Sequence, residues 1–348
     1  MFLRSHYASL TLLALAFGCA SNPPPAAETP AESPVSAPAV ATESSAVAAP
    51  AAAALGTIAT FEAAKGGLPE GLAVQGAFAY VGLAPTGQIM RVALADGTVS
   101  PYAALPTPAA NKGFMTGMEF DASGQLYVAL ASFVDKPQAG IYRVLADGSQ
   151  TSLFAAHERM SFPNGIALAD KGELFVTDSG TGAVFRVSAA GKATPWSTSE
   201  LLKGDKDYCG KGVGASFDIG ANGIARIGNT VYVANNDRAS IVRIPISADG
   251  SAGTPSALAG PDCAMLGGAD GLVADTAGNL VVATNRLNRI IRVSPSGKLE
   301  TLAEGSAFDF PASVSIQGSE LFATNFALAN AMGGKPARPG LLKLRYAL

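Results

Sequence analysis

The sequence has little charge and no long apolar run. Only 15% of its 348 residues are charged, and the formal net charge is −3. It contains no run of lysine and arginine, so the charge pattern gives no reason to expect nucleic acid as a partner. The apolar run over residues 8–17 is too short to span a bilayer as a helix.

Two catalytic motifs are also missing. The sequence has no Gly-x-Ser-x-Gly, which excludes the serine nucleophile elbow. It has no glycine-rich loop followed by Lys-Ser or Lys-Thr, which excludes that kind of phosphate cradle. It does have 48% hydrophobic residues, 39 glycines and 22 prolines. This composition is typical of a large core interrupted by many turns.

The N-terminus is typical of an export signal. Arg4 supplies a positive charge before the apolar run. The segment from Leu15 to Cys19 resembles a bacterial lipobox, which implies that Cys19 is lipidated and becomes the first mature residue. Ordinary secretion with cleavage near Ala20 is the alternative. Residues 20–54 are rich in Pro, Ala, Ser and Glu without apolar periodicity, so they are predicted to be a disordered linker.

These segments predict an exported protein of the cell envelope, with a signal peptide over 1–19, a linker over 20–54 and one domain over 55–348. Because Ala20 rather than Asp follows Cys19, the outer membrane is the expected destination, facing the periplasm or the outside. The lipid anchor would be the only contact with a membrane. The domain itself is expected to be a monomer.

One short phrase recurs six times along the domain. In each copy a polar residue, usually followed by Gly, opens a short apolar strand. The six polar residues lie 43 to 58 positions apart and are Glu70, Thr116, Asn164, Asn222, Asp270 and Ser313. A near-constant period of this length indicates an array of β units.

Each unit reads as four short strands separated by turn residues. In the third unit these strands are expected over residues 165–168, 173–177, 183–188 and 193–197. Six such units predict an all-β fold, a six-bladed β-propeller. The sixth unit ends after three strands, so the segment 55–61 is predicted to complete the last blade and close the ring.

Ring closure would bring the six polar residues together on one axis. All six carry oxygen, two are acidic and two are carboxamides. Hard cations such as Ca²⁺ prefer this mixture of carboxylate and carbonyl oxygens. The set contains no His, Cys or Met, which argues against zinc and copper. Asn-Gly and Asp-Gly are also common turn pairs, so turn formation is the alternative for each single motif.

Four of these motifs resemble the senescence marker protein/gluconolactonase/regucalcin family of six-bladed propellers. They are Leu68–Gly71, Phe162–Gly165, Ala221–Gly223 and Ala269–Gly271. The resemblance implies that Glu70, Asn164, Asn222 and Asp270 hold a divalent metal ion, usually Ca²⁺, on the axis. It also implies hydrolysis of lactones or related esters, with a small molecule as substrate. Some relatives carry an acid where this chain has Val273, so a second, buried calcium is not expected.

Several side chains have candidate roles in such a reaction. A divalent ion can polarise a carbonyl or phosphoryl oxygen and bind the attacking water. Asp270 is expected to accept the proton of that water or to attack the substrate itself. Thr116 is a candidate contact for water or substrate, with a plain strand-opening role as the alternative. His157 lies in a loop seven residues before Asn164 and is the second catalytic candidate, with a solvated surface position as the alternative.

Two further groups of residues support structural expectations. Cys209 and Cys263 lie in loops that lead to adjacent inner strands, and export would favour a disulfide between them over two free thiols. Four polar residues recur at the ends of second strands and are expected to close turns. They are Asp178, Asn235, Asn285 and Asn325.

A non-catalytic function is the second hypothesis. Propellers of the NHL-repeat kind look similar blade by blade, as residues 176–182 illustrate, and they bind a protein or ligand rather than catalyse. The fold alone does not decide between the two. The two acids and two carboxamides predicted on the axis favour the metal-dependent hydrolase.

Overall fold

The computed structural model of this protein describes residues 55–210 and 217–346. The predicted signal peptide with Cys19 and the predicted linker over 20–54 lie outside these residues and stay predictions. Within the described ranges, no helix is long and apolar enough to cross a membrane.

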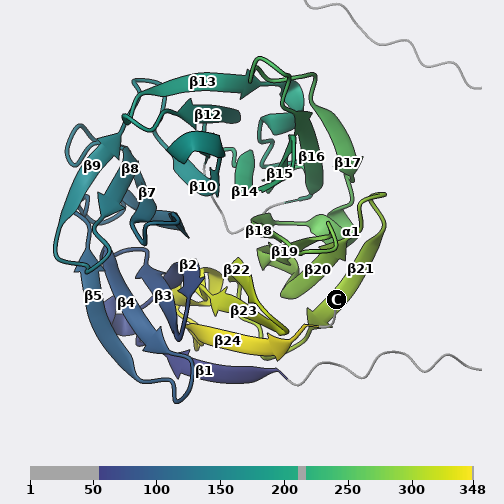
Figure 1. The fold of residues 1–348 in the computed structure, drawn as a ribbon. Coiled ribbons are helices and arrows are strands. Elements are labelled where there is room, and N and C mark those ends of the chain that lie inside the picture. Colours follow the sequence, from purple (N-terminus) through teal and green to yellow (C-terminus); the bar gives the residue numbers. More distant parts are fainter. Residues whose placement is uncertain (1–54, 211–216, 347–348) are drawn as a thin grey trace, which may run out of the picture. The chain divides into compact units, whose positions relative to one another are not determined.

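The domain is a six-bladed β-propeller, which confirms the predicted fold class (Figure 1). Six sheets of four antiparallel strands surround one axis. From inner to outer strand, the first three blades are β2 (Pro69–Gln75), β3 (Phe78–Leu83), β4 (Gln88–Ala93) and β5 (Val99–Ala104); β6 (Gly113–Phe120), β7 (Leu126–Ser132), β8 (Gly140–Val144) and β9 (Thr151–Ala155); and β10 (Pro163–Leu168), β11 (Leu174–Asp178), β12 (Ala183–Val187) and β13 (Ala193–Thr198).

The other three blades follow the same order. They are β14 (Ala221–Ile227), β15 (Thr230–Asn235), β16 (Ser240–Pro245) and β17 (Ser256–Ala259); β18 (Ala269–Ala274), β19 (Leu280–Thr284), β20 (Arg289–Val293) and β21 (Leu299–Glu304); and β22 (Pro311–Gln317), β23 (Glu320–Asn325), β24 (Gly340–Arg345) and β1 (Gly56–Thr60).

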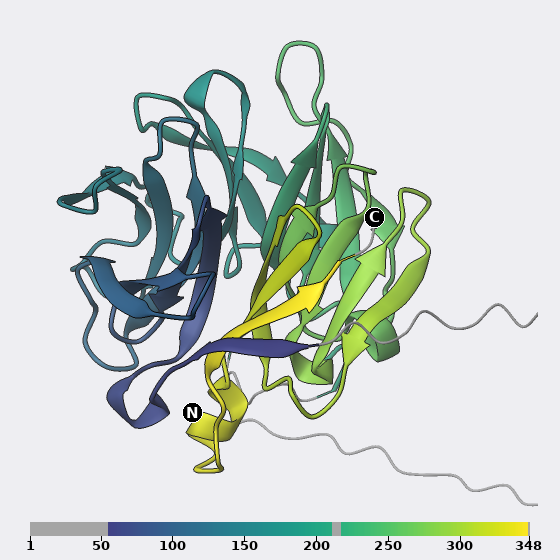
Figure 2. The same ribbon diagram turned by 60° about the horizontal axis from the view of Figure 1, so that its bottom comes forward.

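The N-terminal strand completes the last blade, as predicted. β1 pairs antiparallel with β24, with Gly56 opposite Lys343 and Thr60 opposite Gly340. Figure 2 shows the purple strand β1 beside the yellow strand β24. The two ends of the domain therefore share one sheet, and this pairing covers an edge of β24 that would otherwise be free.

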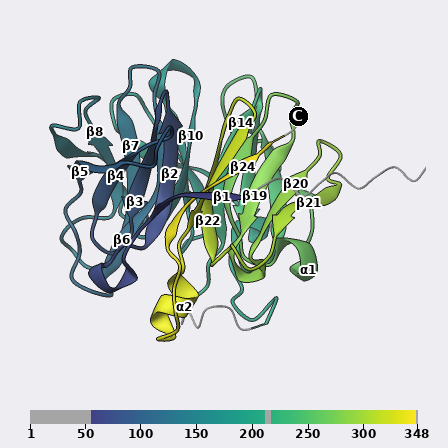
Figure 3. The same cartoon turned by 90° about the horizontal axis from the view of Figure 1, so that it is seen from below.

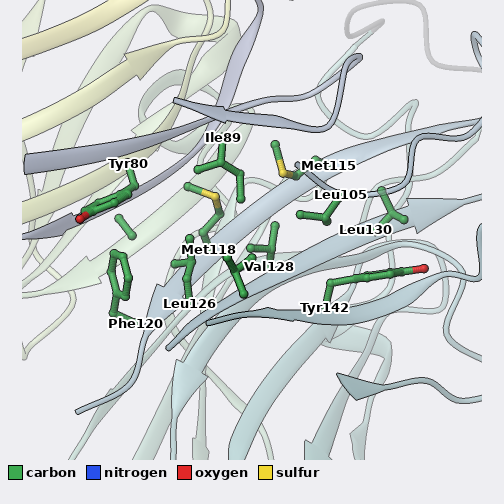
Figure 4. Packing of buried hydrophobic residues seen from close by; sticks show 12 residues of the cluster. Tyr80, Ile89, Leu105, Met115, Met118, Phe120, Leu126, Val128, Leu130 and Tyr142 are labelled. Atoms are coloured by element: carbon green, nitrogen blue, oxygen red, sulfur yellow. The ribbon is translucent and has the colours of Figure 1, made fainter. Parts of the chain in front are cut away.

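The hydrophobic core lies between neighbouring blades. Leu126, Val128 and Leu130 of β7 pack toward the first blade, as the close view in Figure 4 shows. Tyr127 and Ala129 of the same strand pack toward the third blade. Because alternate residues of a strand face opposite sides of a sheet, a second strand buried on both sides reads as a continuous apolar run.

The inner strands approach one another closely at a ring of glycines. A Cβ atom on Gly223 would lie 2.2 Å from the Asp270 carbonyl oxygen, and one on Gly165 would lie 2.7 Å from that of Asn222. Gly71, Gly117 and Gly271 face the next blade in the same way. None of these five glycines has a positive φ. They lie at β-bulges. These positions therefore require glycine because a larger residue would not fit, and not because of a turn conformation.

Buried threonine hydroxyl groups link neighbouring inner strands at the same level. The Thr177 hydroxyl accepts a hydrogen bond from the Gly165 N–H and donates one to the Asn222 carbonyl oxygen of the next blade. The Thr324 hydroxyl donates to the Glu70 carbonyl oxygen at 2.9 Å, across the junction between the last and first blades. These bonds fix the backbone of two of the residues predicted to hold the metal.

The short helices lie in the loops. Figure 3 shows α1 and α2 at the same end of the ring, where the inner strands begin; this end is called the mouth below. The helical segments are α1 (Cys263–Leu266), α2 (Leu328–Met332) and the 3-10 turns η1 (Ala63–Lys65), η2 (Asp170–Gly172), η3 (Glu200–Leu202) and η4 (Asn285–Leu287).

Removal of β1 should destabilise the whole ring. We compare a chain that starts at Leu55 with one that starts at Glu62. The shorter chain loses the pairing with β24 and the packing of the buried Ala59. Each kcal/mol lost lowers Tm by about 2–4 °C in a domain of this size, so we expect a fall of at least about 10 °C or aggregation through the exposed edge. Equal melting temperatures for the two chains would contradict the closing role of β1.

The close contact at the axis can be tested with Gly223→Ala. The added methyl group meets the Asp270 backbone at the 2.2 Å distance, so the strands must separate. We expect a loss of about 3 kcal/mol or more in the free energy of unfolding by urea denaturation. The control is Gly56→Ala, where the nearest atom to an added Cβ lies at 3.9 Å. Similar stabilities for the two variants would show that the inner strands are not in close contact at Gly223.

Candidate functional site

The strand register places five of the six predicted polar residues at equivalent positions at the β-bulge of an inner strand. Asn164 lies two residues before Ile166, which pairs with Val176, and Asn222 lies two residues before Ile224, which pairs with Val233. Glu70, Thr116 and Asp270 stand at the same position in their blades. The inner strands contact one another around the ring, so these positions converge on the axis.

The prediction for the sixth blade was wrong by one residue. Val314 pairs with Ala323 as Ile166 pairs with Val176, so the equivalent of Asn164 is Ala312 and not Ser313. Ser313 occupies the position of the ring glycines, and its N–H donates to the Thr324 hydroxyl at 3.0 Å. The sixth blade therefore contributes a methyl group and no oxygen ligand at this level.

The four residues predicted to hold the metal are all buried. Glu70, Asn164, Asn222 and Asp270 are between 4% and 6% exposed. A cavity of about 100 Å³ on the axis is lined by all six inner strands, and both Asn164 and Asp270 belong to its wall. Asp270 therefore borders a partly open space large enough for a few water molecules.

Both axial carboxyl groups have raised pKa values. Burial raises the pKa of Asp270 to about 7, against the opposing effect of hydrogen bonds from Asn285 and Asn222. Burial also raises the pKa of Glu70 well above its usual range, and the negative charge of Asp270 adds to this effect. The two carboxyl groups are therefore close enough to repel each other. Within the described ranges, no lysine or arginine contributes to either shift.

Two buried oxygen atoms of this site lack a hydrogen-bond donor among the described residues. Glu70 Oε2 and Asn222 Oδ1 are inaccessible to solvent and accept no hydrogen bond from the residues that the structure describes. Buried acceptors without a partner are rare and costly. A hard cation satisfies such oxygens, and two carboxylates balance a divalent charge. The residues present therefore fit a Ca²⁺-type ion.

The donor set differs from common acidic or thiol metal sites. Across residues 55–210 and 217–346, no three His, Cys, Asp or Glu side chains come together in a way that could hold a metal ion. A cation on the axis would depend on two carboxylates and two neutral carboxamides, as the sequence predicts. Neutral carboxamide ligands are compatible with calcium and unfavourable for copper or zinc.

Asn285 is a site residue that the sequence pattern assigned to a turn. Its Nδ2 donates to Asp270 Oδ2 at 2.9 Å, and its own Oδ1 is buried without a donor. Ala269 pairs with Thr284, whereas Pro163 pairs with Asp178, so Asn285 lies one residue beyond the turn-closing position. The Thr284 hydroxyl bonds to the Arg289 carbonyl oxygen in the turn instead. Alignment of the second strands could have revealed this, because Asn285 lies five residues after Leu280, whereas Asp178 lies four residues after Leu174.

Asp178 and Asn235 close their turns as predicted, because Asp178 Oδ1 accepts from the Thr181 N–H and Asn235 Oδ1 from the Arg238 N–H. Asp178, Asn235 and Asn325 also bind the backbone of loops that precede inner strands. Asp178 accepts hydrogen bonds from the N–H groups of Ser161 and Phe162, and Asn235 donates to the carbonyl oxygens of Leu201 and Lys203. Asn325 accepts from the Asp309 N–H and donates to the Ala307 carbonyl oxygen. These bonds hold the loops that lead into the inner strands.

Thr116 belongs to the ring of polar residues, but its hydroxyl group is hydrogen-bonded to the backbone of the next blade. The side chain is fully buried, and its hydroxyl donates to the Pro163 carbonyl oxygen of the next blade at 2.8 Å. This hydroxyl is a link between blades, like those of Thr177 and Thr324. The structure gives it no free face for water or substrate.

His157 is not brought to the axis. Its ring packs against Phe185 of β12, with ring centroids 5.3 Å apart, and its Nδ1 accepts a hydrogen bond from the Arg159 N–H. β12 is the third strand of its blade, two strands outward from β10. We therefore assign no catalytic role to His157.

Cys209 and Cys263 form a disulfide, with their Cα atoms 5.4 Å apart. Cys209 belongs to the loop that leads to β14, and Cys263 begins α1 just before β18. The bond joins two loops at the mouth, next to the strands that carry Asn222 and Asp270.

Glu119 is a third carboxyl group on the wall of the axial cavity. It lies on β6 three residues beyond Thr116, deeper along the axis than the ring of polar residues. Burial raises its pKa to about 7, while the Phe120 backbone N–H acts in the opposite direction. The polar repeat did not reveal Glu119, because the other inner strands carry apolar or hydroxyl side chains at this position.

Comparison with known proteins supports the fold assignment. No protein-family model matches the sequence, and no curated protein matches it. Three similar solved structures are a luciferin-regenerating enzyme (TM-score 0.61, 15% identity, 85% of this chain and 96% of that chain), a gluconolactonase from Xanthomonas campestris (TM-score 0.59, 18% identity, 85% and 90%), and the calcium-binding protein regucalcin from Agrobacterium tumefaciens (TM-score 0.56, 17% identity, 81% and 92%). At these identities the similarity shows a shared propeller fold.

Stability in the absence of metal should depend on pH through Asp270. The folded protein keeps the Asp270 proton up to pH about 7, whereas an unfolded Asp loses it near pH 4. Between these values the folded state binds more protons, so the free energy of unfolding falls as pH rises, by about 1.4 kcal/mol per unit for one group. We expect Tm measured with a chelator to fall between pH 5 and 7.

The control for this prediction is Asp270→Asn, which removes the titrating carboxyl group. It also removes the negative charge that raises the pKa of Glu70. The fall in Tm should then become smaller, with the contributions of the buried Glu70 and Glu119 remaining. Saturating Ca²⁺ should also reduce the fall, because protons and metal compete for the same oxygens. A wild-type Tm that rises from pH 5 to 7 in chelator would contradict the raised pKa values.

Proposed function

We propose that this protein is a metal-dependent hydrolase of lactones or related esters. The observation that carries the proposal is the buried axial group itself. Two mutually repelling carboxyl groups and two carboxamides surround one axis, with oxygen acceptors that lack donors. Burial of carboxyl groups and unpaired oxygen acceptors destabilises the fold when no cation is bound. A propeller with a purely structural role would therefore gain nothing from this arrangement. The shared fold with a gluconolactonase and with a calcium-binding regucalcin supports it further.

The reaction follows from the residues at the site. Glu70, Asn164, Asn222 and Asp270 would hold the ion. When bound, the ion supplies a Lewis acid that polarises the substrate carbonyl group and makes water more acidic. Asp270 takes one proton from the attacking water while the water oxygen adds to the carbonyl carbon. The ester C–O bond then breaks, the leaving oxygen takes that proton, and the product is a hydroxy acid.

Asn285 acts as a positioning residue in this scheme. Its Nδ2 donates to Asp270 Oδ2, which restricts rotation of the carboxyl group. The hydrogen bond also favours the ionised form of Asp270, the form that accepts a proton. Direct attack by Asp270 on the carbonyl carbon, with a covalent ester intermediate, is the second possible route.

The proposal extends to location. The lipobox-like segment ending at Cys19 supports export and lipid anchoring, and the disulfide between Cys209 and Cys263 is compatible with an oxidising compartment. The domain would then work at the cell envelope, attached through the linker over 20–54.

Metal content and a panel of lactones test the proposed activity. We expect the purified protein to retain Ca²⁺ after dialysis and to hydrolyse at least one lactone, with activity lost in chelator and restored by Ca²⁺. Asp270→Asn should lower kcat/KM by at least about a hundredfold, the usual scale for loss of a proton acceptor. Metal content is measured by plasma emission spectroscopy and hydrolysis by proton release.

The matched control is Glu119→Gln, which removes a carboxylate from the same cavity but outside the ring of polar residues. It should keep the metal and most of the activity. Bound metal without turnover of any lactone or ester by the wild type would contradict the hydrolase, and would favour the NHL-like binding propeller as the function.

A further inference from the structure

The residues just above the polar ring are unevenly distributed around the mouth. Each lies two positions before a ring residue, and all but Phe114 immediately precede an inner strand. In the sixth, first, second and third blades these residues are apolar, and in the fourth and fifth blades they are glycines. They are Phe310, Leu68, Phe114, Phe162, Gly220 and Gly268. The mouth therefore has an apolar arc on one side, of which Leu68, Phe162 and Phe310 are buried, and small residues on the side of Asn222 and Asp270.

Two exposed aromatic rings extend this arc. Phe133 follows β7 at the mouth end of the second blade, and Phe217 precedes β14. They are 45% and 42% exposed, and within the described parts of the chain they are the only exposed phenylalanines. Isolated exposed apolar residues need no explanation, but these two are in contact with each other and with the arc.

The contacts form one continuous aromatic cluster. Phe133 lies 6.3 Å from Phe114, 6.0 Å from Phe162 and 5.9 Å from Phe217, measured between ring centroids. Phe162 lies 5.3 Å from Phe114 and 5.9 Å from Phe217. Phe133 of the second blade contacts Phe217 of the loop before the fourth blade, so this contact crosses the mouth end of the third blade. The four rings of Phe114, Phe133, Phe162 and Phe217 are called the aromatic wall below.

We propose that this wall binds an apolar alkyl or aryl group of the substrate, so that the enzyme prefers lipophilic lactones and esters to polyhydroxylated sugar lactones. The inference rests on the hydrolase function proposed above and names its substrate class. Phe114 and Phe162 are two residues before Thr116 and Asn164, so the wall lies against the mouth side of the polar ring. The axial cavity is lined by ring residues and by residues beyond them, on the opposite side of the ring. Aromatic rings offer dispersion contact and few hydrogen bonds, so they favour an apolar group over a sugar hydroxyl.

The test compares substrates that differ only in an alkyl chain. γ-Butyrolactone and γ-nonanolactone share the reacting ring, and the second carries a pentyl chain; gluconolactone represents the sugar lactones. We expect kcat/KM to be at least about tenfold higher for γ-nonanolactone than for the other two, because a few methylene groups in an apolar pocket are worth that much. The double variant Phe133→Ala/Phe217→Ala should lose this preference while its kcat/KM for γ-butyrolactone stays within about twofold.

Leu153→Ala provides the matched control, because Leu153 is 42% exposed but lies on the outer strand β9, away from the mouth. It should keep the full chain-length preference. Turnover of lactones with no gain from the pentyl chain, or a gain that survives in the double variant, would overturn the inference and leave the hydrolase function standing.

Binding of an unreactive analogue separates the inference from the activity. In 3-pentylcyclopentanone a methylene group replaces the ring oxygen, so no ester bond can be cleaved. By calorimetry with Ca²⁺ present, we expect it to bind the wild type at least about tenfold more tightly than cyclopentanone. The double variant should not distinguish the two ketones. If the wild type does not distinguish them, the role proposed for the aromatic wall is wrong whether or not any lactone is hydrolysed.

Discussion

The close packing of the inner strands around the axis is the constraint on which the rest of the structure depends. Five ring glycines bring the inner strands together at five of the six junctions, and the Thr324 hydroxyl bonds across the sixth. This packing turns six separate sheets into one ring. It also brings residues that are far apart in the sequence so close together that the charges of Glu70 and Asp270 repel each other.

The chemistry of the site is a consequence of that crowding. Glu70 and Asp270 have lost most of their contact with water and have gained no basic partner among the described residues. Their pKa values rise because ionisation is unfavourable there without a cation. A carboxyl group with a pKa near 7 is suited to exchange protons at neutral pH. The proposed cation site and the role proposed for Asp270 therefore depend on the same burial.

The sequence pattern was sufficient for the fold, because the period, the missing last strand and the ring residues are all properties of local sequence. It failed where function depends on register. The pattern points to Ser313 because the sixth blade lacks the glycine that marks the position in five others, and the register gives Ala312 instead. It groups Asn285 with the turn residues, although Asn285 lies one residue beyond Thr284, the last residue of β19. Contacts such as Phe133 with Phe217 depend on loops crossing a blade, which no periodicity encodes.

The pairing of β1 with β24 sets the order in which the domain can be completed. β1 leaves the ribosome first, and its partner leaves last, nearly the whole domain later. The earlier blades can assemble during synthesis, but the final sheet must wait until β24 has been made. The edge of β1 that pairs with β24 therefore stays unpaired while the strands between them are synthesised, and ring closure is the last step in assembly of the sheets.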